Sequence, residues 1–212
     1  MRLPSPPLLL ISDRSQARTD LVEIVRTSFA AGCRWTSLRE KDLPASAQTK
    51  LLKALLLAAK PCGARVTLHG DPRLARDAGA DGVHLPAGND PAAARRLLGR
   101  DALIGLSIHH AGETEMLEPV DVDYVLAGPV FVTQSKPGYG PALGPEGLAL
   151  IVNLSPVPVI AIGGITPENA GDCLVAGAAG VAVMGGIIRA ENPGEVTTQL
   201  VAALAASQPR PR

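Results

Sequence analysis

The segment 123–145 holds the residues of this chain that are best suited to chemistry. It opens with a continuous apolar run at 124–127, after which glycines and prolines replace any helical periodicity. Thr133, Ser135 and Lys136 lie in this second part. Short hydroxyls and a lysine on glycine-rich backbone after a strand are typical of an anion site, because N–H groups and a point charge converge on phosphate oxygens. Taken alone, the segment could equally be a solvated surface loop.

Two later apolar runs each end in a pair of glycines. The first pair is Gly163-Gly164, and the second is Gly185-Gly186, which Met184 precedes. Backbone amides on such glycine turns bind phosphate in many barrel enzymes. We therefore expect Gly163, Gly164, Met184 and Gly185 to bind an anionic substrate. Plain turns are the alternative, because glycine is common wherever the chain reverses.

Further polar residues follow other apolar runs. Arg39 and Lys41 come after the second run and add positive charge, so the ligand is expected to carry more than one phosphate. A solvated charged cap is the alternative for these two residues. His69, Ser107 and His109 also stand at the ends of runs, where a histidine could bind substrate or act as a general acid or base.

The remaining histidine and the cysteines have simpler interpretations. His84 lies inside an apolar run and is predicted to be a core histidine with one hydrogen-bonded nitrogen. Cys33, Cys62 and Cys173 are widely spaced, form no CxxC pair and have no evident base beside them. They are predicted to be structural thiols of a reducing compartment.

Eight apolar runs alternate with helical patterns from one end of the chain to the other. The runs are continuous, as expected for strands that are covered on both faces. This pattern predicts an α/β fold, a single TIM (β/α)8 barrel, whose active site lies at the carboxyl ends of the strands. A doubly wound open sheet would need a GxGxxG turn after the first run, where Ser12-Asp13-Arg14 stands. The expected strands are 8–12, 35–38, 65–68, 82–85, 102–107, 124–127, 157–162 and 180–183; the expected helices are 19–32, 47–60, 74–78, 91–98, 113–117, 145–152, 166–177 and 193–205.

Composition narrows the function further. Residues 1–212 are expected to form one domain, with a core at 8–206 and a frayed tail at 207–212. Twenty basic residues against twenty acidic ones, with 2% aromatic residues, argue against a nucleic-acid-binding protein. No apolar run is long enough to span a membrane, and 8–11 is too short for a signal peptide, so a cytoplasmic protein that does not bind membranes is expected.

The motifs in order resemble those of the thiamine-phosphate synthase and thiazole tautomerase family, the TenI-like barrels, over nearly the whole length. Each motif is weak alone, but the full series at the family's spacing is specific. The motifs are 38–43 (LREKDL), 79–85 (GADGVHL), 105–109 (GLSIH), 123–125 (DYV), 128–131 (GPVF), 133–136 (TQSK), 159–165 (VIAIGGI) and 180–183 (GVAV).

The resemblance implies small phosphorylated substrates and a transferase reaction. The synthases join hydroxymethylpyrimidine diphosphate to a thiazole phosphate and release pyrophosphate, through a pyrimidine-methyl cation that the thiazole nitrogen attacks. By resemblance, Arg39, Lys41 and Lys136 would bind the diphosphate, with Lys136 stabilising the leaving group. Ser107 would hydrogen-bond the pyrimidine or the leaving pyrophosphate. Thr133 and Ser135 would lie beside the thiazole phosphate, near the glycine pairs.

The resemblance also implies Mg²⁺ as a cofactor, and a homodimer at the level of the family. The carboxylates that hold the metal in the synthases are replaced here by Gly70 and Asn89. Asp71 and Asp90 each lie one residue further on, so Asp71, Asp90 and Asn89 are the candidate metal ligands.

Two other functions stay open at this point. One is a metal-independent thiazole tautomerase-like isomerase that uses His69 or His109, although the tautomerases tend to carry a histidine where this chain has Pro129. The other is a non-catalytic binder of a thiamine-pathway phosphate.

Overall fold

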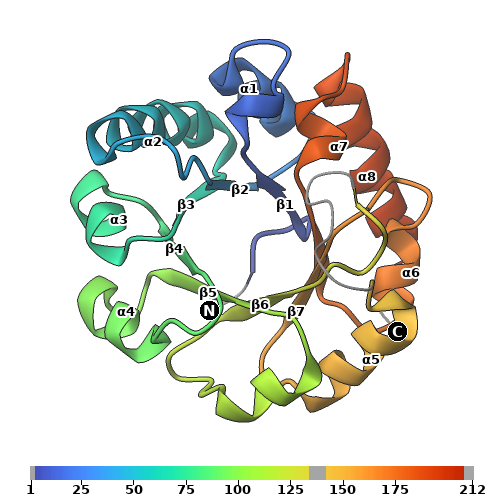
Figure 1. The fold of residues 1–212 in the computed structure, drawn as a ribbon. Helices are drawn as coiled ribbons and strands as arrows, with labels where there is room; N and C mark the ends of the chain where they lie inside the picture. Colours follow the sequence, from blue (N-terminus) through green and yellow to red (C-terminus); the bar gives the residue numbers. More distant parts are fainter. Residues whose placement is uncertain (1–2, 134–141, 208–212) are drawn as a thin grey trace.

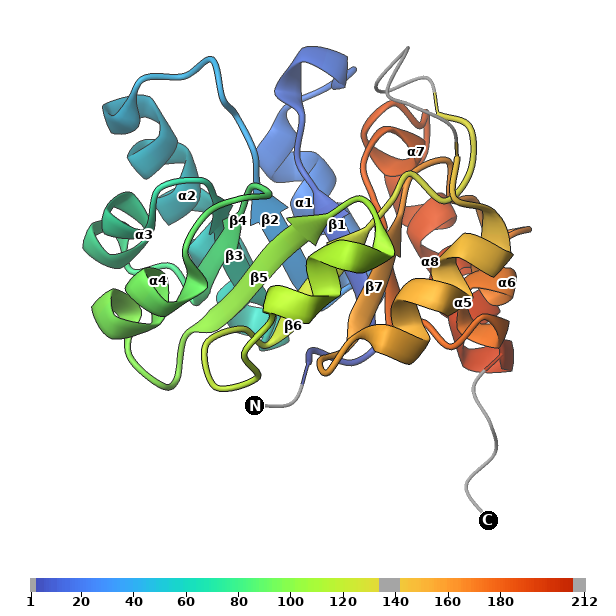
Figure 2. The same ribbon diagram turned by 60° about the horizontal axis from the view of Figure 1, so that its bottom comes forward.

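Eight parallel strands close into a barrel in the computed structural model, which describes residues 3–133 and 142–207, without the side chain of Met116. Each strand pairs with the next in sequence, and β8 pairs with β1 to close the ring. The view in Figure 1 is along the barrel, and Figure 2 shows it from the side with the strands running upward. The strands are β1 (Leu8–Ile11), β2 (Trp35–Leu38), β3 (Arg65–His69), β4 (Gly82–Leu85), β5 (Leu103–Ile108), β6 (Tyr124–Ala127), β7 (Val159–Ile162) and β8 (Gly180–Val183).

Helices surround the barrel and cover the outer faces of the strands (Figure 1). They are α1 (Leu21–Ala30), α2 (Ala45–Ala59), α3 (Pro72–Ala78), α4 (Pro91–Leu98), α5 (Gly144–Leu154), α6 (Ala170–Val175), α7 (Gly185–Ile188) and α8 (Pro193–Ser207), with the 3₁₀ turns η1 (Arg14–Gln16), η2 (Lys60–Cys62) and η3 (Ala111–Met116). Among the described residues, none of these helices combines the length and the apolar character that crossing a membrane requires.

Strand alternation divides the apolar residues into two layers. Side chains facing outward pack against the helices in the larger cluster, which includes Leu8, Leu10 and Val66. Side chains facing inward form a smaller cluster inside the barrel, which includes Leu9 and Trp35. Successive strand residues point to opposite faces, so a continuous apolar run is what a strand between two apolar layers requires.

The barrel interior also holds a row of rings that ends near the carboxyl edge of the strands. Trp35 meets Tyr124 edge-on with ring centroids 4.7 Å apart, Tyr124 stacks on His84 at 5.6 Å, and His84 stacks on His69 at 5.4 Å. Gly105 leaves the space for this row, because a Cβ there would lie 2.6 Å from His84 Nδ1 and closer still to the Tyr124 ring.

The structure confirms the predicted barrel, and all eight strands lie within two residues of their expected ends. The expected helix 166–177 was too long, because Asn169 accepts a hydrogen bond from the Thr166 N–H at 2.8 Å and donates to the Gly164 carbonyl at 3.0 Å. These contacts form a turn, so α6 begins only at Ala170.

Four smaller expectations need correction. The helix expected at 113–117 is the 3₁₀ turn η3. The helix expected at 19–32 begins at Leu21, because Asp20 caps α1 by accepting a hydrogen bond from the Glu23 N–H at 3.1 Å. Ser207 is the last residue of α8 and not part of a tail, while 208–212 lie outside the described residues. Residues 185–188, expected only as a turn, form the short helix α7. The assignment of residues 1–212 to one domain stays a prediction.

Candidate active site at the carboxyl ends of the strands

A cavity of about 350 Å³ opens at the carboxyl ends of β5 to β8. We call this side of the rim the cavity half, and the ends of β1 to β4 the charged half. Of the residues predicted from sequence, Ser107, His109 and Thr133 line the cavity together with the two glycine motifs, Gly163-Gly164 and Met184-Gly185. Ser135 and Lys136 lie outside the described residues.

Close backbone packing between the loops after β6 and β7 shapes the cavity half. The Val130 N–H donates to the Ile162 carbonyl at 2.8 Å, and the Phe131 N–H donates to the Gly163 carbonyl at 3.0 Å. Gly163 has φ +100°, and a Cβ there would lie 2.6 Å from Pro129 Cβ and 2.7 Å from Pro129 Cα. Only glycine satisfies both the conformation and the contact, so this wall of the cavity depends on the residue type at 163.

Ser107 is held in place by His84. The Ser107 hydroxyl lies 2.8 Å from His84 Nε2, and His84 Nδ1 lies 3.2 Å from the Tyr124 hydroxyl. His84 is buried, and its desolvation, assisted by the positive charge that His69 can carry, holds the pKa of the imidazole well below 6.5. The imidazole is therefore neutral at physiological pH. The predicted core histidine thus has both nitrogens engaged, and it positions a cavity residue, which the sequence reasoning missed.

His109 is tied to the loop that follows β5. Glu113 accepts hydrogen bonds from the His109 N–H at 2.5 Å and the His110 N–H at 3.1 Å, and His109 Nδ1 lies 3.9 Å from the same carboxylate. Desolvation of Glu113 is outweighed by these hydrogen bonds, so the pKa of its carboxyl lies below 4.5. His109 lines the cavity, so it is placed where it could contact a substrate.

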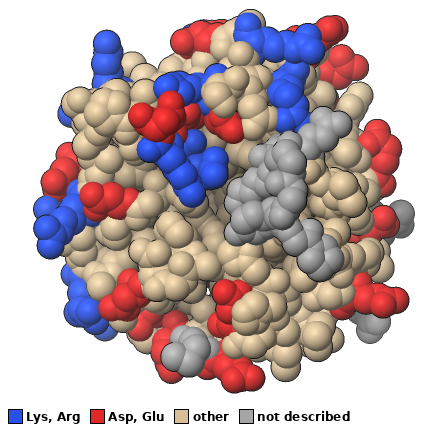
Figure 3. Space-filling view, in the orientation of Figure 1, with Lys and Arg blue, Asp and Glu red and all other residues tan. Residues whose placement is uncertain are grey.

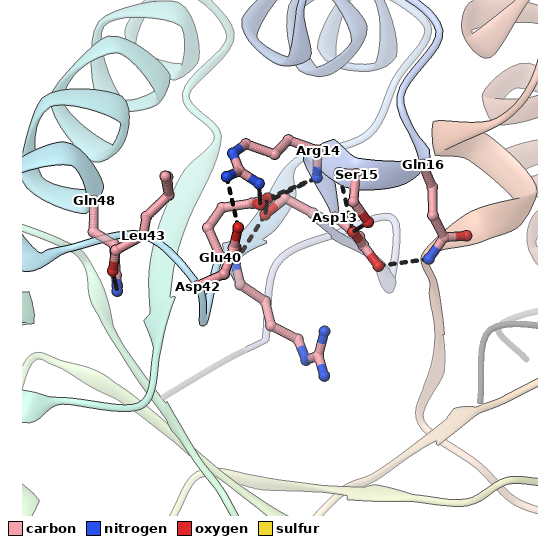
Figure 4. A network of polar contacts seen from close by, with 10 residues as sticks. Asp13, Arg14, Ser15, Gln16, Glu40, Asp42, Leu43 and Gln48 are labelled. Carbon is pink, nitrogen blue, oxygen red and sulfur yellow. Dashed lines mark hydrogen bonds and ion pairs between the residues drawn. The ribbon is translucent and has the colours of Figure 1, made fainter.

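The charged half is organised by a buried carboxylate, Glu40, which is only 3% exposed (Figure 4). Glu40 accepts hydrogen bonds from the Ser12 hydroxyl at 2.7 Å and from the Arg14 N–H at 3.0 and 3.1 Å. The Arg14 guanidinium donates to Asp42 at 2.6 Å. Glu40 is therefore not part of a solvated cap, because a buried network joins it to the loop after β1, while Lys41 and Asp42 are exposed.

This network places the two predicted cations. The Arg39 N–H donates to the Ser12 hydroxyl at 2.8 Å, which fixes the backbone where Arg39 leaves β2. Partial desolvation and, second, the charge of Arg39 lower the pKa of Lys41 below 10.5. Two neighbouring cations repel each other, so an anion bound between them would relieve that repulsion. The space-filling view of this face shows Lys and Arg side chains beside a central hollow (Figure 3).

Two of the three candidate metal ligands, Asp71 and Asp90, cap helices. Asp71 accepts a hydrogen bond from the Arg73 N–H at 2.7 Å at the start of α3, and Asp90 accepts one from the Ala93 N–H at 3.2 Å at the start of α4. The Asn89 side-chain amide donates to the Pro86 carbonyl at 3.1 Å. Within residues 3–133 and 142–207, no group of three His, Cys, Asp or Glu side chains lies close enough together to hold a metal ion without a substrate. The described residues therefore do not fit a preformed Mg²⁺ site.

Arg189 lines the cavity and was not among the residues predicted from sequence. It follows α7, and its guanidinium donates to the side-chain carbonyl of Gln16 in the loop after β1. The available signal was an arginine one helical turn after Gly185. It was missed because the glycines were expected to form only a turn.

Comparisons with known proteins agree with this geometry. A family model described as thiamine monophosphate synthase matches residues 8–187. A putative thiamine-phosphate synthase from Geobacter sulfurreducens is 42% identical over 93% of both chains, and a thiamine-phosphate synthase from Chlorobium luteolum is 37% identical over 93% of this chain and 92% of its own. A solved structure of thiamine phosphate pyrophosphorylase from Pyrococcus furiosus superimposes with a TM-score of 0.84 at 29% identity, covering 94% of this chain and 96% of that chain.

Proposed function

Because this chain belongs to the thiamine monophosphate synthase family and works as a thiamine-phosphate synthase, a transferase of thiamine biosynthesis, we propose that the two halves of its rim bind its two phosphorylated substrates separately. The observation that carries this proposal is the division of the rim into a glycine-lined cavity and a pair of neighbouring cations.

The charged half is assigned to hydroxymethylpyrimidine diphosphate. Arg39 and Lys41 would neutralise the diphosphate, which makes it a better leaving group because charge accumulates on its oxygens as the C–O bond breaks. Lys136 is assigned to the bridging and leaving oxygens. His69 is the last residue of β3, on the same half, and is assigned to the pyrimidine.

The cavity half is assigned to thiazole phosphate. The backbone at Gly163, Gly164, Met184 and Gly185 would donate N–H groups to the phosphate, with Thr133 and Ser135 beside it. Ser107 stands between the two halves and would hold the pyrimidine or the leaving pyrophosphate while His109 contacts substrate at the cavity mouth.

The proposed reaction has two steps. The C–O bond of the pyrimidine diphosphate breaks and its electron pair leaves with pyrophosphate, so a pyrimidine-methyl cation remains. The thiazole nitrogen then donates its lone pair to that carbon and forms the new C–N bond. Apolar side chains such as Ile108 and Leu126 line the cavity and would keep water from capturing the cation.

A metal has no assigned step in this mechanism. Thiamine-phosphate synthases typically use Mg²⁺, but Asp71, Asp90 and Asn89 are engaged in local hydrogen bonds. We propose that Mg²⁺, where it is required, binds together with the diphosphate substrate. The homodimer expected from the family stays a prediction.

The test is formation of thiamine phosphate from both substrates, with Mg²⁺ titrated from zero. We expect Lys136→Ala to reduce kcat by about 100-fold or more, as removal of one preorganised charge at a leaving group does. Arg39→Ala is expected to act mainly on the KM for the pyrimidine diphosphate.

Lys60→Ala is the matched control, because Lys60 is an exposed lysine that precedes β3 and so lies at the opposite end of the barrel. Near-normal turnover of Lys136→Ala would contradict the mechanism. Thiazole phosphate binding by the wild type without product would contradict the synthase function and favour a binder.

A further inference from the structure

Arg189 occupies the space beside Gly185 at the wall of the cavity. A Cβ added at Gly185 would lie 2.5 Å from Arg189 Cζ and 2.6 Å from Nη2. Helical side chains point back toward the helix N-terminus, so a residue four positions later can cover the position of a missing side chain. The guanidinium therefore lies where the side chain of residue 185 would otherwise stand.

We propose that Arg189 is the side chain that binds the anionic group of the substrate in the cavity half, and that residue 185 is glycine so that Arg189 can reach it. The proposal rests on the proposed function for the identity of that anion, thiazole phosphate. A guanidinium presents five N–H donors in a planar fork that matches two phosphate oxygens. Backbone amides alone supply hydrogen bonds but no full positive charge, and Arg189 supplies it.

The guanidinium is held toward the cavity from the other side of the β8–β1 seam. Gln16 accepts a hydrogen bond from Arg189 Nη1. Gln16 Nε2 donates to Asp13 Oδ2 at 2.5 Å, and this second contact is drawn in Figure 4. Asp13 in turn accepts hydrogen bonds from Ser15. Gln16 and Asp13 are thus positioning residues, and they keep a flexible side chain in one orientation.

A purely structural role for Arg189 predicts a different binding result from a role in anion binding. If Arg189 only tethered α7 to the loop after β1, its removal would weaken all ligands of the cavity equally. If it binds the anion, its removal weakens ligands that carry a phosphate and spares those that do not. The thiazole phosphate and the corresponding thiazole alcohol form the pair of probes that separates the two roles.

The experiment measures binding of both probes and steady-state kinetics of Arg189→Ala. We expect the affinity for thiazole phosphate to fall about 10- to 100-fold, the effect of losing charge-assisted hydrogen bonds, and the affinity for the alcohol to change less than about twofold. The KM for thiazole phosphate should rise while the KM for the pyrimidine diphosphate stays unchanged. Arg189→Lys should recover part of the loss because it keeps the charge.

Arg18→Ala is the matched control. Arg18 pairs with Glu191 at 3.2 Å and joins the same two segments at the surface, with 60% of its side chain exposed. It should leave both affinities unchanged. Equal losses for the phosphate and the alcohol, or an Arg18→Ala loss as large as that of Arg189→Ala, would overturn the proposal.

A second variant tests the role of Gly185. Gly185→Ala should displace the guanidinium at little steric cost, because the end of a flexible side chain can move, and should weaken thiazole phosphate binding. Adding Arg189→Ala to it should then cause no further loss, whereas additive losses would overturn the link between the two residues. The binding comparison does not depend on turnover, so it decides the role of Arg189 even if the wild type makes no product.

Discussion

The cavity half and the charged half of the rim are both suited to anion binding, but they are built from different chemical groups. The cavity half is built mainly from backbone, glycines and apolar side chains, with Arg189 at its wall, and the loops after β6 and β7 pack so closely that Gly163 has no room for a Cβ. The charged half consists of side chains, and the buried Glu40 fixes the loops that carry Arg39 and Lys41. The backbone wall of the first half is sensitive to steric change, and the loops of the second half are sensitive to a change of charge at Glu40.

The largest expected effect follows from steric sensitivity. Gly163→Ala should lower the free energy of unfolding by about 3 to 4 kcal/mol, because a residue with a Cβ is strained at φ +100° and also overlaps Pro129. Gly70 is the matched control in the charged half: it has φ +114°, but nothing lies within 4 Å of an added Cβ. Gly70→Ala should therefore cost only about 1 to 2 kcal/mol.

Chemical denaturation of the two variants measures this difference. Gly163→Ala should also lose thiazole phosphate binding, while Gly70→Ala keeps it. Equal losses of stability would mean that backbone conformation alone, and not the contact with Pro129, fixes the cavity wall.

The next effect follows from charge sensitivity in the other half. Glu40→Gln keeps the shape of the side chain but turns one acceptor into a donor that faces donors, so we expect a loss of about 1.5 to 3 kcal/mol in unfolding free energy. The KM for the pyrimidine diphosphate should rise and that for thiazole phosphate should not. Asp42→Asn is the control, because the Arg14–Asp42 pair is largely exposed and worth about 1 kcal/mol or less.

The pH dependence of Glu40→Gln adds an independent check. Desolvation, only partly offset by hydrogen bonds, raises the pKa of Glu40 above 4.5. The unfolded chain then releases this proton at lower pH than the folded protein does, so wild-type stability falls as pH rises from 4.5 through the raised pKa. Glu40→Gln should lack this contribution, and an unchanged slope would contradict a raised pKa.

The same contrast explains what could be predicted from the sequence. Continuous apolar runs such as 82–85 and 124–127 coincide with β4 and β6. A strand between two apolar layers needs apolar residues at consecutive positions, and this pattern can be read directly from the sequence. The cavity half was predicted for the same reason, since glycines after strands are visible in the sequence. Every described residue assigned to the glycine motifs lines the cavity.

Contacts between side chains that are distant in sequence were not predictable in this way. Glu40 belongs to a charged run for which a solvated cap was the alternative, and only the fold shows that it is buried and accepts hydrogen bonds from Ser12 and Arg14. His84 was predicted to be a core histidine, but its contact with Ser107 depends on the register between β4 and β5. The approach of Arg189 to Gln16 depends on barrel closure between β8 and β1.

The smallest expected effect concerns the charge of Lys41, which should make ligand affinity depend on alkaline pH in the charged half but not in the cavity half. Because partial desolvation and Arg39 lower the pKa of Lys41, the free protein loses this positive charge at a lower pH than an ordinary lysine does. The affinity for the pyrimidine diphosphate should therefore fall as pH rises through that lowered pKa, while the affinity for thiazole phosphate shows no such limb. Lys41→Arg stays charged to higher pH, so the alkaline fall in affinity should move to higher pH in this variant. At neutral pH its kcat/KM should change by about threefold or less, because the substitution retains the charge at a largely exposed position. An alkaline limb that stays in place in Lys41→Arg would assign the titration to another group and remove Lys41 from the diphosphate site.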